Sequence, residues 1–311
     1  MEVDLHSLGI PATIPLKNIS IPIELIPREG ITGEILEAGG AHRCKLDYLK
    51  VVNQGTYGII QKVQRGGHTL VVKRPTAAAA KDSLLAEAVV QWIAGNVLAG
   101  EGVSGAVPKV ADIFIHGDEA RFTMEYIDGK SALETIYNSA DPDRAFIECL
   151  SQVCLILSIL EDKIYLDHRD LKMTNLWIRR RPVSYSYGGV RLEAPFQVVV
   201  LDFGFACLGN GEGTTIVNLG DVIPDIDPCP KDGRDLYQCV MSLWSVEQVR
   251  SRLSDAMQAE VKTWIAVKGG SERIRESSSS LEWAYMLTSH PKFSHSLLRP
   301  ERLIKRLISL S

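Results

Sequence analysis

The sequence lacks three features that would each point to a particular class of protein. Its six cysteines form no Cys-x-x-Cys pair and no zinc-type Cys/His spacing, so we expect reduced thiols, as in a cytoplasmic or nuclear protein. The longest apolar stretch, residues 149–160, is broken by Ser151 and Gln152 and is too short to span a bilayer. No apolar block follows Met1, so we expect no secretory signal.

An excess of basic residues is also missing. The chain has 34 Lys and Arg against 38 Asp and Glu, which gives a formal net charge of -4. Proteins that bind phosphate backbones or anionic membrane surfaces usually carry a basic excess. We therefore expect neither a nucleic acid nor a membrane as partner.

What is present is enough apolar sequence for a sizeable core, at 45% of 311 residues, and the length suggests two domains or one two-lobed unit. Residues 1–44 are rich in Ile, Pro and Gly, which predicts an extended leader without a long helix. Residues 45–127 show strand-like runs separated by turns, and one helix begins near Asp82 or Ser83. Residues 128–311 are mainly helical. The pattern predicts an α+β fold with a small five-stranded antiparallel sheet in the first part.

Three motifs occur in one order along the chain. The string HRDLKMTN occupies residues 168–175, Asp202-Phe203-Gly204 begins 32 residues after Asp170, and Val72-Lys73 lies far upstream. Together they resemble the signature set of the protein kinases. The resemblance covers roughly residues 46–311 and implies a bilobal kinase fold. Residues 45–127 would be the β-rich N-lobe with one helix, and residues 128–311 the larger, mostly helical C-lobe.

The resemblance implies roles for several polar residues of the HRDLKMTN and Asp-Phe-Gly strings. Phosphoryl transfer depends on positioning and charge neutralisation more than on covalent help. Asp170 would orient the acceptor hydroxyl and take its proton, and Lys172 would meet the γ-phosphate. Asn175 and Asp202 would supply oxygen ligands to Mg²⁺. The form Asp-Leu-Lys-x-x-Asn is similar to that of Ser/Thr kinases, so the acceptors would be Ser and Thr hydroxyls of a protein substrate.

The nucleotide, ATP, would be held mainly by residues of the first part. Lys73 would bind the α- and β-phosphates, and Glu87, 14 residues further on, would hold Lys73 through an ion pair. The string Asn53-x-Gly55-x-x-Gly58 resembles the kinase phosphate loop, with Asn in place of the first glycine. Gly55 and Gly58 would let the backbone approach a phosphate.

Residues 122–127 are similar to the strand that leads into the hinge of a kinase. The backbone of Glu125 and Ile127 would bind adenine, and Met124 would gate a pocket behind it. The plainer interpretation of the same residues is an ordinary edge strand.

The chain departs from the kinase pattern after the third motif. No Ala-Pro-Glu lies between Asp202 and Asp235, where the family anchors its activation segment. Asp235 resembles the helix-start Asp that braces the catalytic loop, and its plainer interpretation is a helix N-cap. Phosphorylation of Thr214 or Thr215, followed by pairing with Arg169, is a hypothesis that this departure leaves open.

Two other functions remain open at this point. Val71 and Trp177 are larger than the residues that line the adenine slot in the family, and Gln91 is polar where an apolar residue is usual. These differences favour a pseudokinase that binds a protein partner. A small-molecule kinase of the same fold is the other alternative, although such enzymes more often have His-Gly-Asp and lack a counterpart of Lys172.

Overall fold

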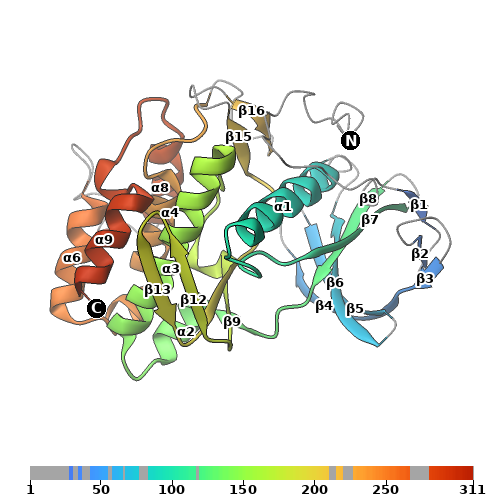
Figure 1. Cartoon of the computed structure of the whole chain (residues 1–311), viewed down its shortest axis with the longest axis horizontal. Helices are drawn as coiled ribbons and strands as arrows, with labels where there is room; N and C mark the ends of the chain where they lie inside the picture. The colour runs from blue at the N-terminus through green and yellow to red at the C-terminus, as the bar shows by residue number, and fades with distance from the viewer. Residues whose placement is uncertain are drawn as a thin grey trace. The chain divides into compact units, whose positions relative to one another are not determined.

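The computed structural model shows two compact units (Figure 1). The first takes the described residues up to Val97 together with Val107–Ile127, and the second takes Leu98–Ala106 together with those from Asp128 onward. The described residues are 28–30, 34–36, 43–54, 58–65, 67–76, 83–116, 119–209, 215–219, 227–266 and 280–310. The fold is α+β, as predicted.

A six-stranded sheet forms the framework of the first unit, in the order β1-β7-β8-β6-β5-β4. The pairing of β1 with β7 is parallel, and the other pairings are antiparallel. The strands are β1 (Arg28–Gly30), β4 (Asp47–Gln54), β5 (Gly58–Arg65), β6 (His68–Pro75), β7 (Val110–His116) and β8 (Glu119–Glu125).

The prediction of five antiparallel strands was therefore wrong in two respects: the sheet has a sixth strand, and this strand pairs in parallel at one edge. The additional strand, β1, comes from residues 1–44, which were predicted as an extended leader and not as part of the sheet. An edge strand such as β7 presents unpaired backbone N–H and C=O groups, and β1 supplies partners for them. The same part of the chain contributes an antiparallel hairpin of β2 (Glu34–Leu36) and β3 (Arg43–Lys45).

Helix α1 (Ser83–Gly100) is apolar on most of its sides. Its buried apolar residues are Leu84, Ala88, Val89, Val90, Ile93, Ala94, Val97 and Leu98. A helix with this distribution belongs in a protein interior. Glu87 and Gln91 are buried with it, so both need hydrogen-bonding partners.

The second unit is built around α3 (Pro142–Ile164), which buries 15 residues. Asp141 caps the start of α3 by accepting a hydrogen bond from the backbone N–H of Arg144 at 3.0 Å, and Pro142 stands where no N–H is needed. The other helices are α2 (Ala132–Asn138), α4 (Arg234–Trp244), α5 (Glu247–Arg250), α6 (Asp255–Ile265), α8 (Ser280–Ser289) and α9 (Pro300–Leu310).

Short strands carry the candidate site of this unit. One sheet has the order β14-β11-β9 and another the order β10-β15-β16. Their bounds are β9 (Gly129–Ser131), β10 (Leu166–Asp167), β11 (Leu176–Arg179), β14 (Gln197–Val200), β15 (Cys207–Gly209) and β16 (Thr215–Asn218). Between β11 and β14 the chain forms a hairpin of β12 (Val183–Tyr187) and β13 (Val190–Ala194). Gly188 and Gly189 have positive φ at its turn, as a two-residue hairpin turn requires.

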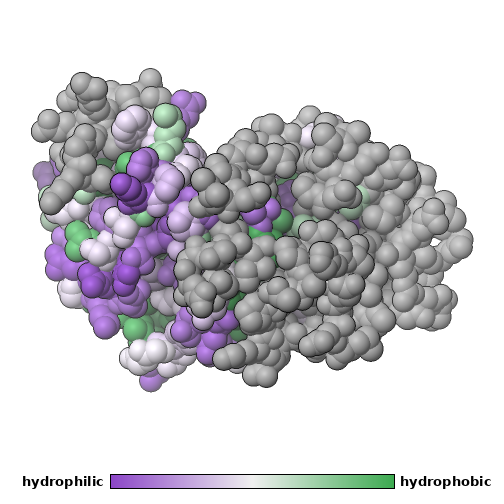
Figure 2. Space-filling model, turned by 90° about the horizontal axis from the view of Figure 1, so that it is seen from above, coloured by the Kyte–Doolittle hydropathy of each residue, from purple (hydrophilic) through white to green (hydrophobic). Residues whose placement is uncertain are grey.

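On one face of the structure, the described residues at the surface are mainly polar. Figure 2 shows one face on which hydrophilic residues prevail and hydrophobic ones are scattered. Within the described ranges, none of the helices combines the length and the apolar character needed to cross a membrane.

A disulfide joins Cys207 in β15 to Cys229, 22 residues further along the chain. The prediction of reduced thiols is wrong for this pair and confirmed for Cys149, Cys154 and Cys239, which are buried and free. The pairing was invisible in the sequence because the two cysteines have no motif spacing. They meet only when the segment between them folds back.

Reduction of this disulfide is expected to lower the free energy of unfolding by about 3 kcal/mol. The bond closes a loop between cysteines 22 residues apart, and its loss increases the conformational entropy of the unfolded chain. Urea unfolding with and without a thiol reductant measures the difference. The double variant Cys207→Ser/Cys229→Ser is the control and should be insensitive to the reductant. Equal stability of the wild-type protein in both conditions would contradict the prediction.

Candidate functional site

Lys73 and Glu87 form the predicted ion pair inside the first unit. The ammonium Nζ of Lys73 lies 2.6 Å from Oε1 of Glu87, and the two side chains are only 7% and 4% exposed. The pair links β6 to α1. Gly58 lies against it, because a Cβ at that position would stand 3.0 Å from Cε of Lys73. The absence of a side chain at Gly58 thus leaves the stem of Lys73 its space, while Gly55 lies outside the described residues.

The hinge-like residues belong to an interior strand, so their interpretation as an edge strand was wrong. Strand β8 lies between β7 and β6, and the N–H of Glu125 donates to the carbonyl of Lys109 at 2.9 Å. Ile127 follows β8 and is buried. Gln91, unexpected on this face of α1, donates to the carbonyl of Pro108 at 2.9 Å and contacts Sδ of Met124 at 3.4 Å. Its amide is therefore partnered in the interior.

The loop of residues 168–175 is held in the second unit by Asp235. The carboxylate of Asp235 accepts hydrogen bonds from the backbone N–H of His168 at 2.6 Å and of Arg169 at 2.8 Å. Arg169 has a φ of 63°, a value that costs energy in a non-glycine residue, and these bonds stabilise it. Asp235 thus braces the loop, and the N-cap of α4 is Gly233.

His168 has a packing role, as predicted. It is 1% exposed, its ring lies 4.9 Å from that of Phe203, and its Nε2 donates to the carbonyl of Leu201 at 2.9 Å. Burial lowers the pKa of His168, so the imidazole is neutral at pH 7. It connects the HRD string to the segment around Asp202-Phe203-Gly204.

The carboxylate of Asp170 is the centre of the polar contacts in the loop. Lys172 Nζ lies 2.8 Å from its Oδ2 and 3.2 Å from its Oδ1. The side-chain amide of Asn175 donates to Oδ2 at 3.0 Å and to the backbone carbonyl of Asp170 at 2.9 Å. The hydroxyl of Tyr285 in α8 donates to Oδ1. The sequence did not indicate Tyr285, which lies 115 residues away in a helix without a motif.

Asn175 and Asp202 flank the same end of the β11–β14 ladder. Leu176 pairs with Val200, and the N–H of Leu201 donates to the carbonyl of Asn175 at 2.9 Å. Asp202 is partly exposed and has a φ of 66°, which turns the chain sharply after β14. Because the amide nitrogen of Asn175 faces Asp170, its oxygen is the atom that could bind a cation together with the Asp202 carboxylate.

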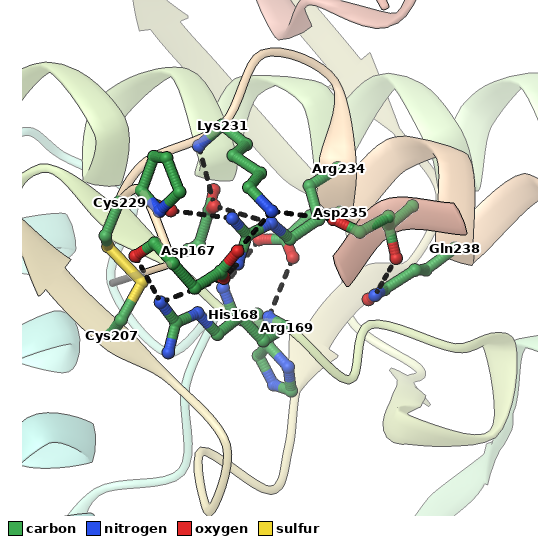
Figure 3. Close-up of polar contacts among 12 residues, drawn as sticks. Asp167, His168, Arg169, Cys207, Cys229, Lys231, Arg234, Asp235 and Gln238 are labelled. Carbon is green, nitrogen blue, oxygen red and sulfur yellow. Dashed lines mark hydrogen bonds and ion pairs between the residues drawn. A yellow bond between two sulfur atoms is a disulfide. The ribbon is translucent and has the colours of Figure 1, made fainter. Parts of the chain in front are cut away.

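Behind the loop lies a group of six buried ionic side chains, which we call the charge cluster (Figure 3). Its members are Asp167, Arg169, Asp227, Lys231, Arg234 and Asp235. Asp227 contacts three cations: Arg234 at 2.7 Å, Arg169 at 3.2 Å, and Lys231. Three acids and three bases balance in formal charge, which makes their burial tolerable.

The charge cluster gives Arg169 its partners. Arg169 has a fully buried side chain that contacts Asp227 and Asn218, so its cationic group has carboxylate and amide partners from within the chain. Thr214 lies outside the described residues, and Thr215 begins β16. Burial, followed by the neighbouring charge of Asp235, raises the pKa of Asp167 to about 7. Asp167 also lies within 4.8 Å of Cys207 and Cys229, but those sulfurs are bonded to each other.

Trp177 lies in β11, opposite Ser131 of β9. A Cβ at Gly129 would stand 3.1 Å from Cδ1 of Trp177 and 2.0 Å from the carbonyl oxygen of Ile178. The first position of β9 therefore requires glycine, because any side chain there would collide with the backbone of β11.

A surface hollow of about 450 Å³ lies elsewhere in the second unit. Its lining includes Lys130, Glu134, Arg144 and Arg180, and none of the predicted site residues. The loop around Asp170 is the candidate site, since the side chains of Lys172, Asn175 and Tyr285 converge there on one carboxylate. No protein-family model matches the chain, and no curated protein matches it, so its function is argued from the site alone.

Proposed function

We propose that the chain is an ATP-dependent protein kinase of bilobal fold that transfers the γ-phosphoryl group to Ser and Thr hydroxyls. The observation that carries the proposal is the Asp170 carboxylate, contacted by Lys172 and Asn175 on a loop that Asp235 holds in place. A general base must be fixed where an acceptor hydroxyl can reach it, and these contacts supply that fixation.

The other residues fit supporting roles in the same reaction. The bond that forms joins the acceptor oxygen to the γ-phosphorus, the bond that breaks joins it to the β–γ bridging oxygen, and Asp170 receives the hydroxyl proton. Lys172 would offset charge on the γ-phosphate. Asn175 and Asp202 would offer oxygens to Mg²⁺, which would offset the charge of the phosphates.

The ion pair of the first unit supports the proposal independently. A buried Lys needs an anionic partner, and Glu87 meets that need from within the first unit. Gly58 leaves room for the stem of Lys73 beside this pair.

Transfer of labelled phosphate from ATP with Mg²⁺ to generic protein substrates tests the proposal. Lys73→Met and Asp202→Ala are each expected to lower the rate on the order of 100-fold or more, because the first removes a cation for the phosphates and the second removes an oxygen ligand for Mg²⁺. Lys130→Met is the matched control: its ammonium pairs with Glu134 on the surface, so the rate should be unchanged.

Two results would contradict the proposal. Absence of transfer by the wild-type protein would favour a pseudokinase that binds a protein partner. Transfer to a metabolite but to no protein would favour a small-molecule kinase of the same fold.

A further inference from the structure

We propose that helix α8 is autoinhibitory: the hydroxyl of Tyr285 occupies the place on Asp170 that an acceptor hydroxyl must take. The inference rests on the proposed function, since it concerns the same carboxylate. It assigns a regulatory role to a helix outside all the recognised motifs.

The contacts of Asp170 divide between its two oxygens. Oδ2 receives the closer contact of Lys172 and the amide of Asn175, whereas Oδ1 receives the hydroxyl of Tyr285. A Ser or Thr acceptor also offers a single O–H and must bring it within hydrogen-bond distance of the base. With Tyr285 in place, the oxygen that would receive this proton already accepts one hydroxyl. The acceptor therefore has to displace Tyr285.

The fold positions Tyr285 through the next turn of α8. Thr288 is 1% exposed, its hydroxyl accepts a hydrogen bond from the side-chain amide of Gln238 in α4 at 2.9 Å, and its carbonyl accepts one from Lys231 at 3.0 Å. Lys231 belongs to the charge cluster whose Asp235 braces the catalytic loop. The helix and the carboxylate that it covers thus share one rigid support, which fixes their contact.

Tyr285 is suited to occupy the site rather than to react there. Burial, followed by the charge of Asp170, raises the pKa of its phenol above the usual value. The hydroxyl therefore stays protonated and remains a donor to Asp170 at physiological pH. Trp283 and Met286 of the same helix are 40% and 68% exposed, so α8 also has a solvent-facing side. Helices covered on one side separate from their support more easily than fully buried ones.

The variant Tyr285→Phe removes only the hydroxyl and tests the inference. We expect the rate of transfer to protein acceptors to rise roughly tenfold, because the hydrogen bond from Tyr285 to the charged carboxylate of Asp170 no longer competes with the acceptor hydroxyl. The KM for the acceptor should fall, and the KM for ATP should stay unchanged. A purely structural role of Tyr285 would not change the two KM values differently. Tyr187→Phe is the matched control. The hydroxyl of Tyr187 donates a hydrogen bond of 2.5 Å to Asp162, and neither residue belongs to the loop of residues 168–175.

A second variant guards against a folding defect in the first. Thr288→Val removes the acceptor of the Gln238 bond without touching Asp170, and we expect a smaller rise in rate. Thermal unfolding of both variants shows whether each remains folded.

The possible results separate the inference from the proposed function. If the wild-type protein transfers phosphate and both variants transfer it at the same rate or more slowly, the autoinhibitory role is overturned and the kinase proposal stands. Phosphate found on Tyr285 of the wild-type protein by mass spectrometry also overturns it, because Tyr285 would then be an acceptor. Absence of transfer by every protein refutes the kinase proposal, and the inference with it.

Discussion

Replacing Asp170 with Asn is expected to lower the rate of phosphoryl transfer by about 10²–10⁴-fold, the usual contribution of a general base. An amide has nearly the size of the carboxylate but cannot receive the proton of the acceptor hydroxyl. Lys172 would also lose its anionic partner at 2.8 Å, which changes where its ammonium lies. The rate of labelled phosphate transfer at saturating ATP measures the effect, and ATP binding should be retained because the phosphate and metal contacts are assigned elsewhere.

Asp162→Asn is the control for this experiment. Asp162 also accepts a hydrogen bond from a tyrosine, Tyr187, but it lies near the end of α3 and has no assigned part in the reaction. Its replacement should leave the rate unchanged. Transfer at the wild-type rate by Asp170→Asn would show that another group takes the proton, and would remove the observation on which the proposed function rests.

Replacing Asp227 with Asn is expected to lower the free energy of unfolding by about 3–5 kcal/mol. Its carboxylate is 3% exposed and contacts Arg169, Lys231 and Arg234, so its loss leaves three buried cations beside the remaining carboxylates of the charge cluster. Water cannot reach these charges to compensate. Urea unfolding followed by circular dichroism measures the difference.

Asp232 provides a control five residues away. Its carboxylate pairs with Arg299, but the two side chains are 39% and 40% exposed, so solvent screens the pair. Asp232→Asn is expected to change the free energy of unfolding by about 1 kcal/mol or less. Equal losses in the two variants would contradict the view that burial sets the energy of the charge cluster.

Local patterns in the sequence were sufficient for much of the fold. Strand-like runs and turns predicted five strands and one helix in residues 45–127, where the structure has β4 to β8 and α1. Residues 128–311 were predicted as mainly helical, and most of the helices lie there. Such predictions succeed because hydrogen bonding and side-chain direction within a strand or a helix repeat over a few residues. The resemblance to the protein kinases also implied the ion pair of Lys73 and Glu87, which the structure contains. Both residues face inward from neighbouring elements, and a buried ammonium requires a nearby anion.

The sequence predicted the role of Asp235 only in part. The sequence allowed either a helix N-cap or a brace for the catalytic loop, since both use an Asp near the start of a helix. The structure decided for the brace by placing α4 against residues 168 and 169, with Gly233 as the cap.

The sequence by itself determined which residues are available for chemistry: the HRDLKMTN string, Asp202, and the pairing of Lys73 with Glu87. Only the tertiary structure decided which distant groups surround them: β1 at the edge of the sheet, Cys207 bonded to Cys229, and Tyr285 on Asp170. The physical reason is that local order follows from interactions over a few residues. Contacts between remote segments depend on how whole elements pack, and no short pattern records that packing.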